Sequence, residues 1–214
     1  MDRALDLKDL RLPFDGSNIV ERSFSQAGQD LFVLALLNGK RNGTYVELGC
    51  NHPFQINNTF LLEALFGWNG ISFDIGEEYK EMWAFRRLPM EVGDARKLDW
   101  DSIAERLGTS HIDYLSLDLE PPEVTLECLR NIPLDLITFG VITFEHDEYR
   151  AGGSVRSSAR EIFDEYGYLR VCSDVMLGGS AFEDWYCDPA VVEASRTAAL
   201  TSDRKDWHEI LFLE

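Results

Sequence analysis

The chain has 214 residues, of which 45% are hydrophobic and 12% aromatic, which is enough for a single α/β domain over residues 1–214. Its formal net charge of −18, from 38 acidic against 20 basic residues, disfavours a nucleic-acid partner and an anionic membrane surface, since both need a basic face. No apolar run approaches the roughly 20 residues that a membrane-spanning helix needs.

The start of the chain and its cysteines bear on location. Residues 1–6 have neither the apolar region nor the cleavage pattern of a secretory signal. The four cysteines form no C-x-x-C pair, which disfavours a structural zinc site, and the apolar surroundings of Cys128 and Cys172 predict reduced, buried thiols. A cytoplasmic protein is the simplest interpretation.

Apolar segments alternate between strand-like and helix-like patterns after an N-terminal arm over residues 1–22. We expect strands over 44–48, 70–75, 90–95, 112–119, 136–144 and 168–176, and an antiparallel return strand over 181–187. We expect helices over 31–37, 60–65, 77–87, 100–107, 123–131 and 155–166, and a C-terminal helix and tail within 189–214. This alternation predicts an α/β fold, with a seven-stranded, mostly parallel sheet and helices on both faces.

Acidic residues follow the predicted strands. Glu47, Asp74, Asp94, Asp118 and Glu145 each fall at a strand end. In sheets of this kind ligands bind at the carboxyl ends of the strands, although a single acid there is more often a helix cap or a solvated turn. Five acids on one edge of the sheet would repel one another unless a cation or ligand hydroxyls lie between them.

The first strand runs into a glycine turn and then a helix. Gly49 permits the turn and lets the backbone come close to a ligand. An acid at the end of the second strand, here Asp74, is placed to accept both hydroxyls of a ribose. The chain lacks the second and third glycines of a pyrophosphate-binding G-x-G-x-x-G turn. An adenosyl ligand without phosphates, such as S-adenosylmethionine, therefore fits better than NAD.

Several motifs, in order along residues 22–188, resemble the FkbM family of class I methyltransferases. The motifs are Ser25–Asp30, Tyr45–Pro53, Asn58–Thr59, Gly67–Ile71 and Ile112–Glu120. The resemblance implies a Rossmann-like sheet and S-adenosylmethionine as the methyl donor. The sequence departs from the family pattern at Pro121 and Pro122, where relatives commonly carry a glycine and a small residue.

The resemblance also implies roles for individual residues around the donor. Glu47 and Gly49 would lie at its methionine end, Asp74 at the ribose, and Asp94 with Ala95 near the adenine. The remaining donor-side positions implied by the family motifs are Gln26, Gln29, Asn58 and Asp118.

Methyl transfer to a hydroxyl needs a base to remove its proton. The candidates are Asp118, Glu120, Glu145 and His146, which follow two neighbouring predicted strands and are expected to converge. The same group has the ligand types of a divalent metal site, so a metal stays open beside the alternative of solvated loop ends.

A basic patch in the second half of the chain suggests an acceptor site. Tyr149, Arg150 and Arg156 would bind an anionic or hydroxylated acceptor, because guanidinium groups pair with carboxylates and phosphates. Arg160, on the same helix face as Arg156, is expected to pair with acids of its own helix at 161, 164 and 165.

Together these features favour O-methylation of a small molecule or saccharide by an S-adenosylmethionine-dependent enzyme. The alternative is a non-catalytic or regulatory relative that binds S-adenosylmethionine, which the two prolines and the acidic surface motivate. The sequence leaves the oligomeric state open.

Overall fold

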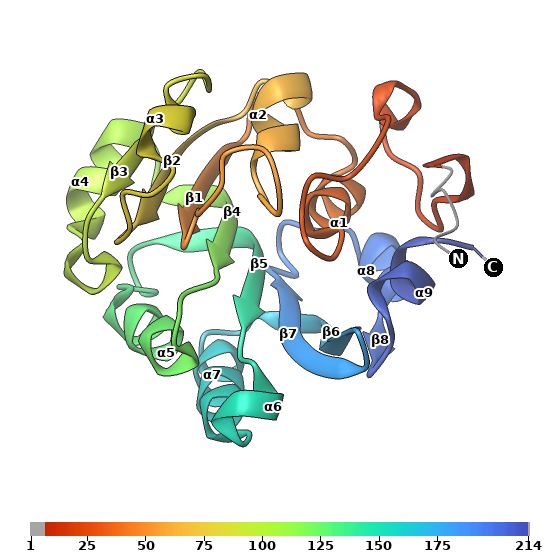
Figure 1. Ribbon diagram of the computed structural model, residues 1–214. Coiled ribbons are helices and arrows are strands. Elements are labelled where there is room, and N and C mark those ends of the chain that lie inside the picture. The colour runs from red at the N-terminus through yellow and green to blue at the C-terminus, as the bar shows by residue number, and fades with distance from the viewer. Residues whose placement is uncertain (1–6, 214) are drawn as a thin grey trace.

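The computed structural model describes residues 7–213, which form an eight-stranded sheet with the order β3-β2-β1-β4-β5-β7-β6-β8 (Figure 1). The strands are β1 (Thr44–Leu48), β2 (Asn69–Asp74), β3 (Met90–Val92), β4 (His111–Leu117), β5 (Thr138–Glu145), β6 (Leu169–Leu177), β7 (Ser180–Cys187) and β8 (Ser202–Asp203). The seven predicted strands are all present. The two-residue β8 was not predicted, because it is too short to show a pattern and exists by pairing with Cys172 and Ser173 of β6.

The helices are α1 (Gln29–Leu36), α2 (Phe60–Phe66), α3 (Lys80–Trp83), α4 (Trp100–Leu107), α5 (Pro122–Asn131), α6 (Glu148–Ala151), α7 (Ser154–Glu165), α8 (Ala194–Leu200) and α9 (Trp207–Leu211). Three short 3-10 helices also occur, at Leu7–Asp9, Ser17–Ile19 and Ala95–Lys97. Each predicted helix therefore has a counterpart, and α6 and α9 are additional.

Two helices are shorter than predicted, since α3 covers only part of 77–87 and α8 only part of 189–200. After α3 the chain turns so that Arg86 reaches the buried carboxylate of Glu63, with 2.6 Å between Nη2 and Oε2. This buried ion pair holds residues 84–87 in turns, although their sequence is compatible with a helix.

The sheet lies between two layers of helices. One hydrophobic core joins the sheet to α1, α2, α8 and α9, and a second joins the opposite face to α4, α5 and α7 (Figure 1). Burial of apolar side chains on both faces explains why the central strands are almost continuously hydrophobic. The predicted α/β, Rossmann-like arrangement with helices on both faces is confirmed.

The strand order changes direction between β1 and β4, which are parallel neighbours. Chain segments leave β1 toward β2 and β3 on one side and leave β4 toward β5 on the other. β7 lies between β5 and β6 and is antiparallel to both, as predicted for the return strand. A change of strand order of this kind creates the crevice at which open α/β sheets bind ligands.

The two chain ends pack on each other within the described range. Leu10 forms an antiparallel bridge with Phe212, and the Arg11 side chain donates to backbone oxygens at 209, 210 and 212. The tail is buried at Ile210 and Leu211, where it forms α9. The part of the N-terminal arm at residues 1–6 lies outside the described residues.

Cys50, Cys128, Cys172 and Cys187 are all buried and free, as predicted for Cys128 and Cys172. Within residues 7–213, none of the helices combines the length and the apolar character that crossing a membrane requires.

Candidate functional site at the carboxyl ends of the strands

Glu47 is the most enclosed of the strand-end acids, with 2% of its surface exposed. Its carboxylate accepts hydrogen bonds from Ser72 Oγ at 2.8 Å, Thr59 Oγ1 at 2.9 Å and the Asn58 backbone N–H at 3.2 Å. Burial raises the pKa of Glu47, and the Arg86 guanidinium and these hydrogen bonds partly oppose that rise. The carboxylate therefore fixes the loop that leads into α2 at the end of β1.

Gly49 has a φ of +90° and lies against the chain where it leaves β4. A Cβ atom at this position would lie 1.6 Å from the backbone oxygen of Asp118. The glycine was expected to permit close approach to a ligand, and the close approach in the structure is to the backbone of a neighbouring strand. Gly49 is what allows the ends of β1 and β4 to come together.

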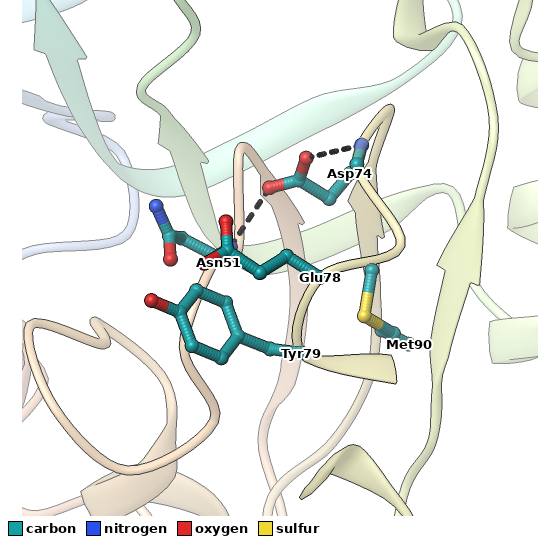
Figure 2. Close-up of a pocket in the computed structure, with 6 residues that line it drawn as sticks. Asn51, Asp74, Glu78, Tyr79 and Met90 are labelled. Carbon is teal, nitrogen blue, oxygen red and sulfur yellow. Dashed lines mark hydrogen bonds between the residues drawn. The ribbon is translucent and has the colours of Figure 1, made fainter. Parts of the chain in front are cut away.

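Asp74 ends β2 and lines a hollow of about 270 Å³, which includes its open mouth. Its carboxylate accepts from two backbone N–H groups, of Asn51 and Gly76, each at 2.8 Å, and Figure 2 shows the Asp74 side chain beside Asn51. Tyr79 and Met90 line the same hollow. The two hydrogen bonds fix the orientation of the carboxylate, and each oxygen keeps a lone pair for a further donor.

Asp94 follows β3 and caps the 3-10 helix Ala95–Lys97 by accepting from the Arg96 backbone N–H. Its carboxylate also receives the Arg96 side chain, at 2.8 Å from Nε. These bonds lower the pKa of Asp94 to about 2. Ala95 is buried against the core beneath α4. Asp94 is thus an ionised helix cap, two residues after the last residue of β3.

Asp118 follows β4 and Glu145 ends β5. Both are half-buried, and neither carboxylate has a hydrogen-bond partner among residues 7–213. Burial raises the pKa of Asp118 well above its ordinary value, and the carboxylates of Glu183 and Asp147 raise it further. A group of acids, in which Asp118 and Glu145 lack partners, therefore lies beside the change of strand order.

Glu183 belongs to this group and was not predicted. It lies opposite Glu145 in the β5–β7 register, and both of its oxygens accept from Gln29 Nε2 at 3.1 Å. Burial raises the pKa of Glu183 to about 7, opposed in part by hydrogen bonds from Trp185 and Gln29. Its sequence signal is an acid between aromatic residues in a buried strand, which is an unusual position for a carboxylate.

The structure does not bring His146 to Glu120 and Glu145, so its predicted convergence with them is wrong. Its Nδ1 accepts from the Glu148 backbone N–H at 3.2 Å, and its Nε2 lies 3.7 Å from Asp174 and 3.6 Å from Asp184. The reason is the tight turn after β5, which places the side chain of His146 beside Asp174 of β6 and Asp184 of β7. Asp147, which follows it, takes the place expected for His146.

Glu120 and Arg150 form an ion pair at the surface, and Arg150 Nη1 also lies 3.2 Å from Asp147 Oδ2. Tyr149 beside them is 59% exposed. These three side chains, Glu120, Tyr149 and Arg150, therefore form an accessible border of the acidic group.

Arg156 and Arg160 lie on one face of α7, as predicted, but that face packs against the sheet. Arg156 pairs with Glu148 at 2.6 Å and with Asp174 at 2.8 Å. Arg160 pairs with Asp184 at 2.7 Å and with Asp174 at 3.0 Å, so the predicted pairing with acids of its own helix is wrong. The acids at 161, 164 and 165 lie on the exposed face of the helix.

Two further predicted positions lie near the turn after β1 and the start of α1. Asn58 is buried and donates from Nδ2 to Ser116 Oγ at 3.0 Å, which links the α2 loop to β4. Gln26 is exposed before α1. The helix itself begins after Gly28, and the Ser25 hydroxyl before it donates to the Asp30 carboxylate at 2.8 Å.

Comparison with known proteins finds solved structures with a similar fold. No protein-family model matches the chain, and no curated protein sequence matches it. Among solved structures, a protein from Clostridium thermocellum assigned as an rRNA methylase is 15% identical, with a TM-score of 0.52 over 78% of this chain and 96% of that one.

Two further structures are less similar. A magnesium protoporphyrin IX methyltransferase from Synechocystis, with bound S-adenosylmethionine, is 15% identical with a TM-score of 0.49 over 73% of this chain and 74% of that one. Human methyltransferase-like protein 13, in complex with S-adenosylhomocysteine, is 15% identical with a TM-score of 0.48 over 81% of this chain and 88% of that one. The first of the three similarities shows that the chain shares the Rossmann-like fold of the Clostridium protein.

Proposed function

We propose that this protein is an S-adenosylmethionine-dependent methyltransferase, related to the FkbM family, that methylates a hydroxyl group of a small molecule or saccharide. The observation that carries the proposal is Asp74. It ends β2, lines an open hollow, and has a carboxylate oriented by two backbone N–H groups with a lone pair free on each oxygen. Such a carboxylate can accept hydrogen bonds from both hydroxyls of a ribose.

The residues around Asp74 fit an adenosyl group. Ile75, the next residue, is 70% exposed, so it offers an apolar surface to a base bound beside Asp74. Asp94 and Ala95, after the adjacent strand β3, would border the adenine. The turn after β1 carries only one glycine, so it has no cradle for a pyrophosphate, which argues against a dinucleotide.

The other end of the donor would lie toward β4. S-adenosylmethionine supplies a methyl group on a positively charged sulfonium. A cation beside the half-buried Asp118 would favour its ionised form, which has the opposite charge. Glu47 acts as a positioning residue in this proposal, because the chain's own donors already occupy its carboxylate and it holds the Asn58 loop in place.

The acceptor would enter at the border formed by Glu120, Tyr149 and Arg150. Carboxylates of Asp118, Glu120 and Glu145 would accept the hydroxyl proton or orient the hydroxyl group. The Clostridium protein is assigned as an rRNA methylase. For this chain a small acceptor fits better than RNA, because its net charge of −18 would repel the phosphates of RNA.

Isothermal titration calorimetry with S-adenosylmethionine and S-adenosylhomocysteine tests donor binding. We expect both to bind the wild type, and Asp74→Ala to weaken binding by about 10- to 100-fold, since it removes charge-assisted hydrogen bonds. Glu165→Gln, an exposed acid on the far side of α7, should leave affinity unchanged. Absence of binding by folded wild-type protein would refute the proposal.

Transfer of a labelled methyl group to a panel of sugars, polyols and RNA then identifies the acceptor. A labelled sugar or polyol supports O-methylation of a small acceptor, and labelled RNA contradicts it. Donor binding without transfer to any member of the panel favours the non-catalytic alternative.

A further inference from the structure

Three carboxylates outside the donor region converge at the end of β5. One oxygen from each of Glu120, Glu145 and Asp147 lies within 4.8 Å of the others. Glu120 is exposed, Glu145 is half-buried and Asp147 is 1% exposed. We call them the β5 acid cluster. They come from the loop after β4, from the end of β5 and from the turn that follows it.

Asp147 provides a second observation that points to a ligand. Its Oδ1 is completely buried and has no hydrogen-bond partner among residues 7–213, whereas its Oδ2 meets Arg150. A buried carboxylate oxygen without a donor costs on the order of 1–3 kcal/mol or more, so such atoms are rare unless something binds them. The unpaired oxygen belongs to a side chain that reaches the cluster.

The protein's own cations leave the cluster undercompensated. Arg150 is the one base paired to it within residues 7–213, and it is itself 47% exposed at the side chain. Glu145 has no hydrogen-bond partner there, and Glu183 lies opposite it in the register of β5 and β7. Several carboxylate oxygens around one point, without nitrogen or sulfur ligands, are the donor set of a hard divalent cation.

The dimensions agree with such a cation. Oxygens on opposite sides of a magnesium or manganese ion lie about 4 Å apart, and those around calcium about 5 Å apart. One oxygen from each of the three residues lies within 4.8 Å of the others, so their separations do not exceed what the larger of these cations spans.

A second group, of His146, Asp174 and Asp184, also has metal-binding residue types, but its oxygens are already used. Asp174 Oδ1 accepts from Arg156 at 2.8 Å and from Arg160 at 3.0 Å, and Asp184 Oδ1 accepts from Arg160 at 2.8 Å. Two guanidinium groups there repel a further cation, so this group is an ion-pair network within the fold.

We propose that Glu120, Glu145 and Asp147 bind a divalent cation of the magnesium or manganese class at the acceptor side of the proposed active site. The proposal rests on the proposed function only for the role of the ion, which would hold and polarise the acceptor hydroxyl. The binding itself is independent of the methyl donor. Water or the acceptor would complete the coordination shell.

Titration of the purified, chelator-treated chain with Mn²⁺ in 0.15 M salt, followed by calorimetry and by the electron paramagnetic resonance signal of free Mn²⁺, tests the site. No donor or acceptor is added, so failure of methyl transfer does not affect the result. We expect one saturable site on the wild type, and Mg²⁺ should displace Mn²⁺ from it.

We expect Glu145→Gln and Asp147→Asn each to weaken Mn²⁺ binding at least 10-fold, and the control Glu165→Gln to leave it unchanged. The Glu145 side chain and Asp147 Oδ1 have no hydrogen bonds to lose, and Asp147→Asn keeps one oxygen that can accept from Arg150. Both variants should therefore fold, and circular dichroism checks this. Unsaturable binding by the wild type, or equal binding by Glu145→Gln and the wild type, overturns the proposal. So does equal weakening in the Glu165→Gln control, which would indicate general attraction to an acidic protein.

Discussion

At the scale of single residues, Gly49 is the position where the fold tolerates a side chain least. We expect Gly49→Ala to destabilise the protein by more than about 4 kcal/mol or to prevent folding, because its Cβ would overlap the Asp118 backbone and its φ is +90°. Gly108→Ala is the matched control, since Gly108 also has a positive φ, +70°, but has open space around it. Urea unfolding measures both, and equal losses would contradict the backbone-contact explanation.

Glu183 makes stability depend on pH. Its folded pKa of about 7 exceeds the ordinary value of 4.5, so the folded chain keeps a proton that the unfolded chain releases between these pH values. The free energy of unfolding should therefore fall as pH rises from 4.5 to 7, by at most on the order of 3 kcal/mol from this group. Below pH 4.5 both states are protonated and the effect of this group vanishes.

The test compares the wild type with Glu183→Gln in urea unfolding at several pH values, with a chelator present throughout. The variant should lose less stability than the wild type across the window, and the difference should follow the titration of one group. Parallel curves for the two proteins would contradict a raised pKa for Glu183 in the folded state.

At the scale of elements, α7 is joined to β6 and β7 by buried ion pairs. Arg160 contacts both Asp174 and Asp184. Burial raises the pKa of Asp184, but the hydrogen bonds from Arg160 and the nearby His146 ring outweigh that effect and hold the pKa below its ordinary value. Arg160→Met should cost about 3 kcal/mol of stability, since it leaves buried carboxylates with fewer partners.

Arg130→Met on the exposed side of α5 is the control for this element, because no interaction of the Arg130 side chain occurs within residues 7–213. Thermal unfolding should show a lower midpoint for Arg160→Met and an unchanged one for Arg130→Met. An unchanged midpoint for both would mean that the ion pairs do not hold α7 to the sheet.

The main elements were predictable because their patterns are local. β1, β4 and β5 are apolar runs ended by an acid or a turn, and each is present within two residues of the predicted bounds. β8 and α6 were not predictable, since they are too short for a periodic signal and depend on contacts distant in the sequence. The shortened α3 has the same kind of cause, the pairing of Arg86 with Glu63 across the fold.

At the scale of the whole molecule, the parallel strands bring the predicted acids to one edge of the sheet. Asp74, Asp118 and Glu145 were predictable because parallel strands align their carboxyl ends. The positions of Glu183 and Asp147 were not predictable from the sequence. Glu183 reaches this edge on β7, the antiparallel strand inserted between β5 and β6, and the tight turn after β5 places Asp147 where His146 was expected.

The change of strand order also separates two regions with different roles in the proposal. The hollow beside Asp74 lies on the β2 and β3 side, and the β5 acid cluster lies on the other side of β1 and β4. A donor on one side and an acceptor on the other would meet above the ends of the central strands, which is the arrangement that in-line transfer requires.

The central claim is that the sheet edge from Asp74 to Asp118 binds an adenosyl methyl donor. A crystal structure of the chain with S-adenosylhomocysteine tests it most directly. We predict that the two ribose hydroxyls lie within hydrogen-bonding distance of the Asp74 carboxylate, with the adenine beside Ala95 and the amino-acid end toward Asp118. A ligand bound elsewhere, or with its ribose turned away from Asp74, would contradict the account.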